Sequence, residues 1–128
     1  LLTHVRDVMR SGERLPAVRE DAMLSHALME MSKKGVGMTA IVDAELHVLG
    51  IYTDGDLRRT LQKNLDFNTT PVRSAMSANP RCISPDALAV EAVQAMETHN
   101  INQLLVVDGN HKLVGALNMH DLLHAKVI

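Results

Sequence analysis

A threonine or an asparagine precedes an aspartate by three residues at two places in the chain. Thr53 precedes Asp56 at the first place, and Asn118 precedes Asp121 at the second. Both pairs stand where a helix is expected to begin, and side chains at that position can bond to each other's backbone amides in a capping box. The same hydroxyl, amide and carboxylate groups can instead bind a polar ligand. The spacing alone leaves both interpretations open.

Other chemistry has less support in the sequence. His120 and His124 are one helical turn apart, but a zinc site needs three or four ligands, and the sequence has neither a cysteine cluster nor an HExxH pattern. The triplet from Asp54 to Asp56 lacks the remaining ligands of a calcium loop. No nucleophile with an activating base and no GxGxxG phosphate loop can be assembled. We therefore expect no catalytic residue, no metal site and no required cofactor.

The two pairs belong to an internal repeat with an offset of 65 residues. Residues 18–59 align with residues 83–124 without a gap, and nine of the 42 aligned positions are identical. A further matching pair of segments, VRDVM at 5–9 and VRSAM at 72–76, heads each copy at a slightly different spacing. The repeat predicts two structural units of the same design, with boundaries at 1–62 and 71–128 and a connector at 63–70.

Hydrophobic periodicity predicts the same elements in each copy, and therefore an α+β fold. The first helix of each unit has an apolar face at helical spacing, a short apolar run follows it as a strand, and Asp43 or Asp108 ends that strand in a polar turn. The return strand contains Gly50 or Gly115, where the missing side chain permits close approach of a backbone or a ligand. A second helix then begins near Asp56 in the first copy and near Asp121 in the second.

The composition favours a soluble globular protein, with 46% hydrophobic and 22% charged residues among 128. A net charge of -2 and only 2% aromatic residues argue against nucleic-acid binding, and no apolar run is long enough to span a membrane. A single Cys82 suits a reducing compartment, so we expect the cytoplasm. The chain begins at Leu1 rather than Met, which we interpret as a piece of a longer protein.

The order of elements, closed by GIYTDGDL at 50–57 and GALNMHDL at 115–122, resembles the tandem CBS domain pair over essentially the whole chain. The resemblance implies two units, each a short lead-in followed by β-α-β-β-α, that pack as a pseudo-two-fold pair with ligand clefts between them. It also implies that a signature carboxylate accepts hydrogen bonds from ribose hydroxyls, while the neighbouring hydroxyl and the helix N-terminal amides face a phosphate. A nucleotide-like small molecule is the expected ligand.

The resemblance further implies that the ligand is contacted by the two closing segments at 50–57 and 115–122, called the signatures below, and by the loop before the second strand of each copy. Arg58 is expected nearer to the ligand than Arg59. Because Asn118 replaces the serine or threonine of the signature, we expect the ligand first in the first copy. The implied ligand-binding residues are Lys34, Met38, Thr53, Gly55, Asp56 and Arg58 in the first copy and His99, Gln103, Asn118, His120 and Asp121 in the second.

The segments GMTAIVD at 37–43, GIYTDGDLRR at 50–59 and MHDLL at 119–123 are similar to the C-terminal CBS pair of bacterial arabinose 5-phosphate isomerases. This resemblance implies a regulatory module, not itself an enzyme, joined to an N-terminal sugar isomerase domain that serves synthesis of Kdo, a lipopolysaccharide sugar. The implied effector is AMP, ATP or a cytidine nucleotide such as CMP-Kdo. A homo-oligomeric parent protein is also implied.

Two alternative functions remain open. In the first, the chain is a purely structural dimerisation module with vestigial clefts. In the second, it is a metal-binding sensor that uses His120 and His124.

Overall fold

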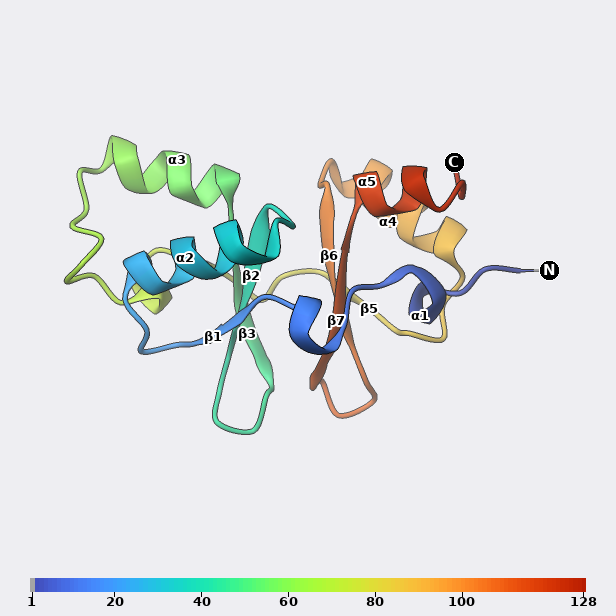
Figure 1. Ribbon diagram of the computed structural model, residues 1–128, viewed down its shortest axis with the longest axis horizontal. Coiled ribbons are helices and arrows are strands. Elements are labelled where there is room, and N and C mark those ends of the chain that lie inside the picture. The colour runs from blue at the N-terminus through green and yellow to red at the C-terminus, as the bar shows by residue number, and fades with distance from the viewer. Residues whose placement is uncertain (1) are drawn as a thin grey trace. The chain divides into compact units, whose positions relative to one another are not determined.

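The computed structural model describes residues 2–128, which fold into five α-helices and seven β-strands (Figure 1). The mixed α+β class predicted from the sequence is confirmed. The contacts divide the chain into two compact units, one of residues 16–80 and the other of the chain up to Leu15 together with Arg81–Ile128. None of the described helices is long and apolar enough to cross a membrane.

The unit of residues 16–80 contains a four-stranded sheet in the order β1-β2-β3-β4. β1 is parallel to β2, and the other neighbours are antiparallel. Every residue of the central strand β2 is buried, as expected for a strand covered on both faces. Its elements are β1 (Ala17–Arg19), α2 (Leu24–Lys34), β2 (Met38–Val42), β3 (Val48–Thr53), α3 (Asp54–Gln62), the 3₁₀-helix η2 (Val72–Ser74) and β4 (Ser77–Ala78).

The other unit repeats this plan with a three-stranded sheet in the order β5-β6-β7. β5 is parallel to β6, and β6 is antiparallel to β7. Its elements are α1 (Val5–Val8), the 3₁₀-helix η1 (Gly12–Arg14), β5 (Cys82–Ile83), α4 (Ala89–His99), β6 (Gln103–Val107), β7 (Leu113–Asn118) and α5 (Met119–His124). The predicted β-α-β-β-α order is therefore present in both copies.

Each unit has its own hydrophobic core, to which one face of the first long helix contributes. The helical spacing seen in the sequence is the buried face in both cases. The buried cluster of the first unit is Leu24, Ala27, Met31, Ile41, Tyr52 and Val72. That of the second is Val5, Ala89, Ala92, Val93, Met96, Leu104, Val106, Leu117 and Leu122.

The two hairpins are closed by the aspartates that the sequence placed in polar turns. Asp43 Oδ1 accepts the backbone amides of Glu45 and His47, both at 2.9 Å, and Asp108 Oδ1 accepts the equivalent two amides at 2.8 and 3.0 Å. Desolvation would raise the pKa of Asp43, but the hydrogen bonds from His47 and Glu45 outweigh it and lower that pKa below its ordinary value. These bonds fix each turn where the strand reverses.

The packed units do not follow the boundaries of the sequence repeat. Residues up to Leu15, which head the first copy, pack with the second copy. There Arg10 forms an antiparallel bridge with Ala116 of β7. Residues 71–80, which head the second copy, pack with the first, where β4 pairs with β3. These two lead-in segments, the chain up to Leu15 and residues 71–80, therefore each cover the edge of a strand whose backbone amides and carbonyls would otherwise be unpaired.

Candidate functional site

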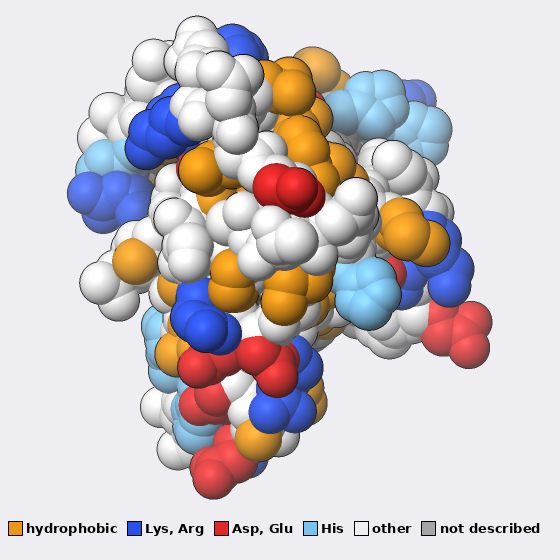
Figure 2. All heavy atoms as spheres, turned by 90° about the vertical axis from the view of Figure 1, so that its left-hand side faces the viewer, with side chains coloured by type: hydrophobic (Ala, Val, Ile, Leu, Met, Phe, Trp, Pro, Cys, Tyr) orange, Lys and Arg blue, Asp and Glu red, His pale blue; other side chains and the backbone are white. Residues whose placement is uncertain are grey.

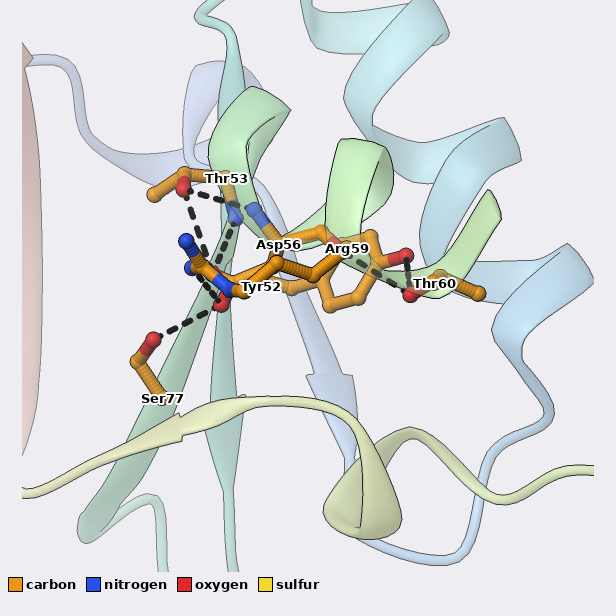
Figure 3. Close-up of polar contacts among 6 residues, drawn as sticks. All are labelled: Tyr52, Thr53, Asp56, Arg59, Thr60 and Ser77. Carbon is orange, nitrogen blue, oxygen red and sulfur yellow. Dashed lines mark hydrogen bonds and ion pairs between the residues drawn. The ribbon is translucent and has the colours of Figure 1, made fainter. Parts of the chain in front are cut away.

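Thr53 and Asp56 lie at the junction between β3 and α3. Thr53 is the N-cap of α3, and its amide donates to Asp56 Oδ2 at 2.9 Å while the amide of Asp56 donates to Thr53 Oγ1 at 3.4 Å (Figure 3). The capping-box interpretation is confirmed. It does not remove the ligand-binding interpretation, because the same box turns the carboxylate toward two further donors.

Those donors are Arg59 and Ser77, which both reach Asp56 Oδ1 at 2.7 Å (Figure 3). Ser77 comes from β4, in the lead-in segment that packs against this unit. The Asp56 side chain is only 3% exposed, whereas that of Arg59 is 58% exposed. The buried carboxylate is thus paired with a cation whose own side chain is largely exposed.

Two linked hydrogen bonds between buried side chains also fix the start of α3. Thr60 Oγ1 donates to the carbonyl of Asp56 at 2.9 Å, which leaves the hydroxyl of Tyr52 as donor to Thr60 Oγ1 at 2.7 Å. Both side chains are buried, and this burial raises the pKa of Tyr52. Because these groups are bonded to one another inside the unit, they fix the orientation of α3.

A polar pocket of about 170 Å³ opens beside the carboxylate. Arg59 in the last turn of α3 and Lys63 at its C-cap supply two positive charges to the wall of this pocket. The complete lining is Asp56, Arg59, Thr60, Lys63, Leu65, Ser74, Ala75, Met76 and Ser77. The pocket is large enough for a sugar or a phosphate group but smaller than a whole nucleotide.

The junction between β7 and α5 repeats the capping box with different neighbours. The amide of Asp121 donates to Asn118 Oδ1 at 2.8 Å, and the amide of Asn118 donates to Asp121 Oδ2 at 3.2 Å. Arg10 then contacts both carboxylate oxygens of Asp121, with Nε at 3.1 Å from Oδ2 and a terminal nitrogen at 2.9 Å from Oδ1. The Arg10 and Asp121 side chains are 18% and 12% exposed.

The strand glycines of both signatures admit a lead-in segment rather than a ligand. A Cβ at Gly50 would overlap the sulfur of Met76 and lie 2.9 Å from the carbonyl oxygen of Ser77. A Cβ at Gly115 would likewise overlap the sulfur of Met9 and lie 3.1 Å from the carbonyl oxygen of Arg10. Of the two possibilities left open by the sequence, close approach of a backbone is the one present here.

The other residues predicted from the first signature lie around Thr53 and Asp56 to different degrees. Gly55 is in the first turn of α3, where the Arg59 guanidinium passes over it. Met38 is buried and pairs in register with Thr53. Arg58 is exposed, and the arginine that reaches the Asp56 carboxylate is Arg59.

Three of the remaining predicted residues lie at the ends of elements. Lys34 ends α2, where its Nζ is 3.6 Å from Glu30 Oε2, and His99 ends α4 in an exposed position. Gln103 is half-buried and pairs in register with Asn118, as Met38 does in the first copy.

His120 is exposed on α5, and its ring stacks on that of His124 with centroids 6.2 Å apart. Within residues 2–128, no group of three or more metal-ligating side chains gathers anywhere.

Sequence reasoning missed Ser77 and Arg10. A signal for both was present, since aligning VRDVM with VRSAM makes Arg10 and Ser77 the next residue in each lead-in. The offset there is 67 rather than 65, so the gapless alignment does not reach them.

Comparison with known proteins places the chain in a family. It matches the family model described as CBS domain at residues 5–63 and 72–128. Arabinose 5-phosphate isomerase KdsD of Pseudomonas aeruginosa is 45% identical over 128 residues, which are 100% of this chain and 39% of that protein. The chain thus spans about two fifths of the length of this curated relative.

Solved structures agree in fold. The CBS domain protein PAE2072 of Pyrobaculum aerophilum, complexed with AMP, aligns with a TM-score of 0.83 at 22% identity over 93% of this chain and 89% of that chain. The CBS domain pair of protein MJ0100, in complex with 5′-methylthioadenosine and S-adenosyl-L-methionine, aligns with a TM-score of 0.88 at 20% identity over 99% and 98%. With two family matches that together cover almost all of its length, and two β-α-β-β-α copies, the chain belongs to the CBS domain family as a tandem pair.

Proposed function

We propose that the chain is a regulatory module whose first copy binds a nucleotide or a nucleotide sugar through Asp56 and Thr53. The observation that carries this proposal is the state of the Asp56 carboxylate, which is buried to 3% exposure yet covered by the 58% exposed Arg59. Because the guanidinium itself is exposed, it regains contact with water when it leaves Asp56, so a ligand that donates hydrogen bonds to the carboxylate can replace it. The hydroxyl of Ser77, the other donor to Oδ1, is of the same kind as a sugar hydroxyl.

The chemistry of the site suits a ribose next to an anion. Two vicinal hydroxyls can donate to Asp56 in place of Arg59 and Ser77, and the displaced guanidinium then stays beside Lys63 on the wall of the pocket. Two cations there favour a phosphate or carboxylate on the ligand. The first amides of α3 offer a second place for an anion.

The solved relatives support the ligand class. One is complexed with AMP, and another with two adenosine-containing compounds. We infer AMP or ATP as candidate effectors, together with cytidine nucleotides such as CMP-Kdo, and no catalytic residue in this chain.

We further propose that the parent protein is an arabinose 5-phosphate isomerase in Kdo and lipopolysaccharide biosynthesis. Support comes from the 45% identity to a KdsD protein over the whole of this chain. The part of that KdsD protein outside the aligned region is long enough for the sugar isomerase domain that the module would regulate. We place the parent protein in the cytoplasm, as a homo-oligomer. Coupling between a regulatory and a catalytic site is typically about 1–3 kcal/mol, which corresponds to a 5- to 150-fold change in affinity.

Thermal denaturation with AMP, ATP, CMP and CMP-Kdo tests the proposal. A ligand at 100 times its dissociation constant stabilises the folded state by about 2.7 kcal/mol, which gives a clear rise in melting temperature. Asp56→Asn should abolish the rise, because the amide cannot accept two hydrogen bonds at both former oxygens. Asp54→Asn is the matched control, since it removes an exposed carboxylate from the same helical turn.

An unchanged melting temperature with all four compounds, in a protein that melts cooperatively, would refute ligand binding. A rise that Asp56→Asn leaves intact would refute the assignment of the site.

A groove beside α2 favours self-association as a second candidate function. It has a volume of about 960 Å³ and runs along the helix, where Met29 is 68% exposed. Figure 2 shows hydrophobic side chains among charged ones on the side of the molecule where α2 and α3 lie in Figure 1. If the groove joins two chains, Met29→Glu should halve the mass measured by sedimentation while leaving the melting curve cooperative.

A further inference from the structure

The chain carries two equivalent carboxylates, and a different residue of each lead-in faces them. Ser77 donates one hydrogen bond to Asp56. Arg10, the equivalent residue of the other lead-in, donates hydrogen bonds to Asp121 from two guanidinium nitrogens. Arg10 and Asp121 are 111 residues apart in the sequence. This contact therefore depends on how the lead-in packs, not on the helix that carries the carboxylate.

Arg10 is held in place by its backbone as well as by its side chain. Its amide donates to the carbonyl of Ala116 at 2.8 Å, and the amide of Ala116 donates back at 3.0 Å. The preceding Met9 fills the space over Gly115. The guanidinium is thus presented to Asp121 by a segment that is fixed on both sides of it.

The arginine at the first carboxylate is bound less firmly. Arg59 reaches a single oxygen of Asp56 from its own helix and is 58% exposed, whereas Arg10 spans both oxygens of Asp121 and is 18% exposed. Exposed pairs are weakened by water and salt, while paired and enclosed charges are costly to separate. A sugar diol can displace Arg59 but would have to leave Arg10 without its anion.

We propose that Arg10 closes the second carboxylate to ligands, so that the duplicated chain binds one nucleotide-type ligand, at Asp56. The guanidinium occupies Asp121 as the two hydroxyls of a ribose would occupy it, and the lead-in cannot make room without losing the pair. This inference rests on the proposed function of Asp56. It adds that one residue of the lead-in decides which copy takes a ligand.

Isothermal titration calorimetry with AMP and CMP as probes tests the inference through an exchange of the two lead-in residues. The unmodified chain should bind one probe molecule. Arg10→Ser, which gives the second copy the residue of the first, should bind two, and Ser77→Arg should bind none. Arg6→Ser is the matched control, because Arg6 lies in the same lead-in but forms an exposed pair with Asp86, and it should still bind one.

A further variant guards against an effect of Asn118. Arg10→Ser combined with Asn118→Thr gives Asp121 the serine and the threonine that surround Asp56, and it should also bind two probe molecules. Thermal melting of each variant shows that it is folded.

The outcomes separate the two proposals. Two molecules bound by the unmodified chain, or one bound by both folded Arg10 variants, would overturn the role of Arg10 and leave Asp56 as a site. No binding by the unmodified chain would overturn the proposed function of Asp56. In that case, binding of one probe by an Arg10 variant would still support closure by Arg10, and no binding by either variant would overturn both.

Discussion

The two copies agree in everything that builds the fold and differ in what surrounds their carboxylates. Both have a capping box at the last helix, a glycine under a lead-in methionine and an aspartate-closed hairpin. Asp56 meets a serine and an exposed arginine, whereas Asp121 meets an enclosed arginine on both oxygens. Duplication has preserved the scaffold while the surroundings of the two carboxylates have diverged, so equal folds do not imply equal surroundings.

The largest expected effect tests the shared part of the comparison. Gly50→Val and Gly115→Val should each lower the free energy of unfolding by about 3 kcal/mol, because the new atoms overlap a methionine and crowd a backbone carbonyl. Urea unfolding measures both. Gly109→Val is the control, since a Cβ there meets no atom within 4 Å. If only one of the two signature variants is destabilised, the two lead-ins do not pack equivalently.

The next effect sharpens the difference between the copies. Arg10→Gln should lower the free energy of unfolding by about 1.5–3 kcal/mol, because it removes charge-assisted hydrogen bonds to an enclosed carboxylate. Arg59→Gln should lower it by less than about 1 kcal/mol, because that arginine is 58% exposed. Equal losses in chemical denaturation would contradict the distinction between a firm and an exchangeable arginine.

These two contrasts also show how far the sequence alone reaches. The helix faces and the capping boxes depend on residues close together in the chain, so periodicity and spacing predicted them, and the repeat follows from aligning the sequence with itself. Arg59 was within reach as well, because residues three apart on a helix are neighbours, and that rule favours Arg59 over Arg58 as partner of Asp56.

The contacts of Ser77 and Arg10 were beyond such rules. They depend on each lead-in packing against the sheet edge of the opposite copy, at separations of 21 and 111 residues. Local preferences do not determine which edge a short segment covers, since either edge offers the same unpaired backbone groups.

A smaller effect concerns the polar chain that only the first copy has. Tyr52→Phe removes the hydrogen bond to Thr60 and should lower the free energy of unfolding by about 1 kcal/mol. Thr60→Val should have a larger effect, because it also removes the bond to the carbonyl of Asp56. In a double-mutant cycle the two changes should be non-additive. Additive losses would show that the two side chains do not act together.

The smallest expected effect compares the hairpins. The pKa of Asp43 is lower in the folded chain than in the unfolded chain, so its carboxylate stabilises the fold above the ordinary pKa of 3.8 and loses that effect as the pH falls through the folded value. Asp43→Asn should therefore be less stable than the unmodified chain at pH 7, with the difference shrinking on acidification below 3.8. Melting temperatures across that range measure it, and a difference that does not change with pH would contradict the role given to the charge.

The central claim is that the first carboxylate is open to a ligand and the second is closed by Arg10. Titration of the isotope-labelled chain with AMP or CMP, followed through assigned backbone amide signals, tests it directly. The account predicts that the signals of Thr53 and Asp56 shift and saturate while those of Asn118 and Asp121 stay in place. Saturating shifts of the Asn118 and Asp121 signals at the same probe concentrations would contradict it.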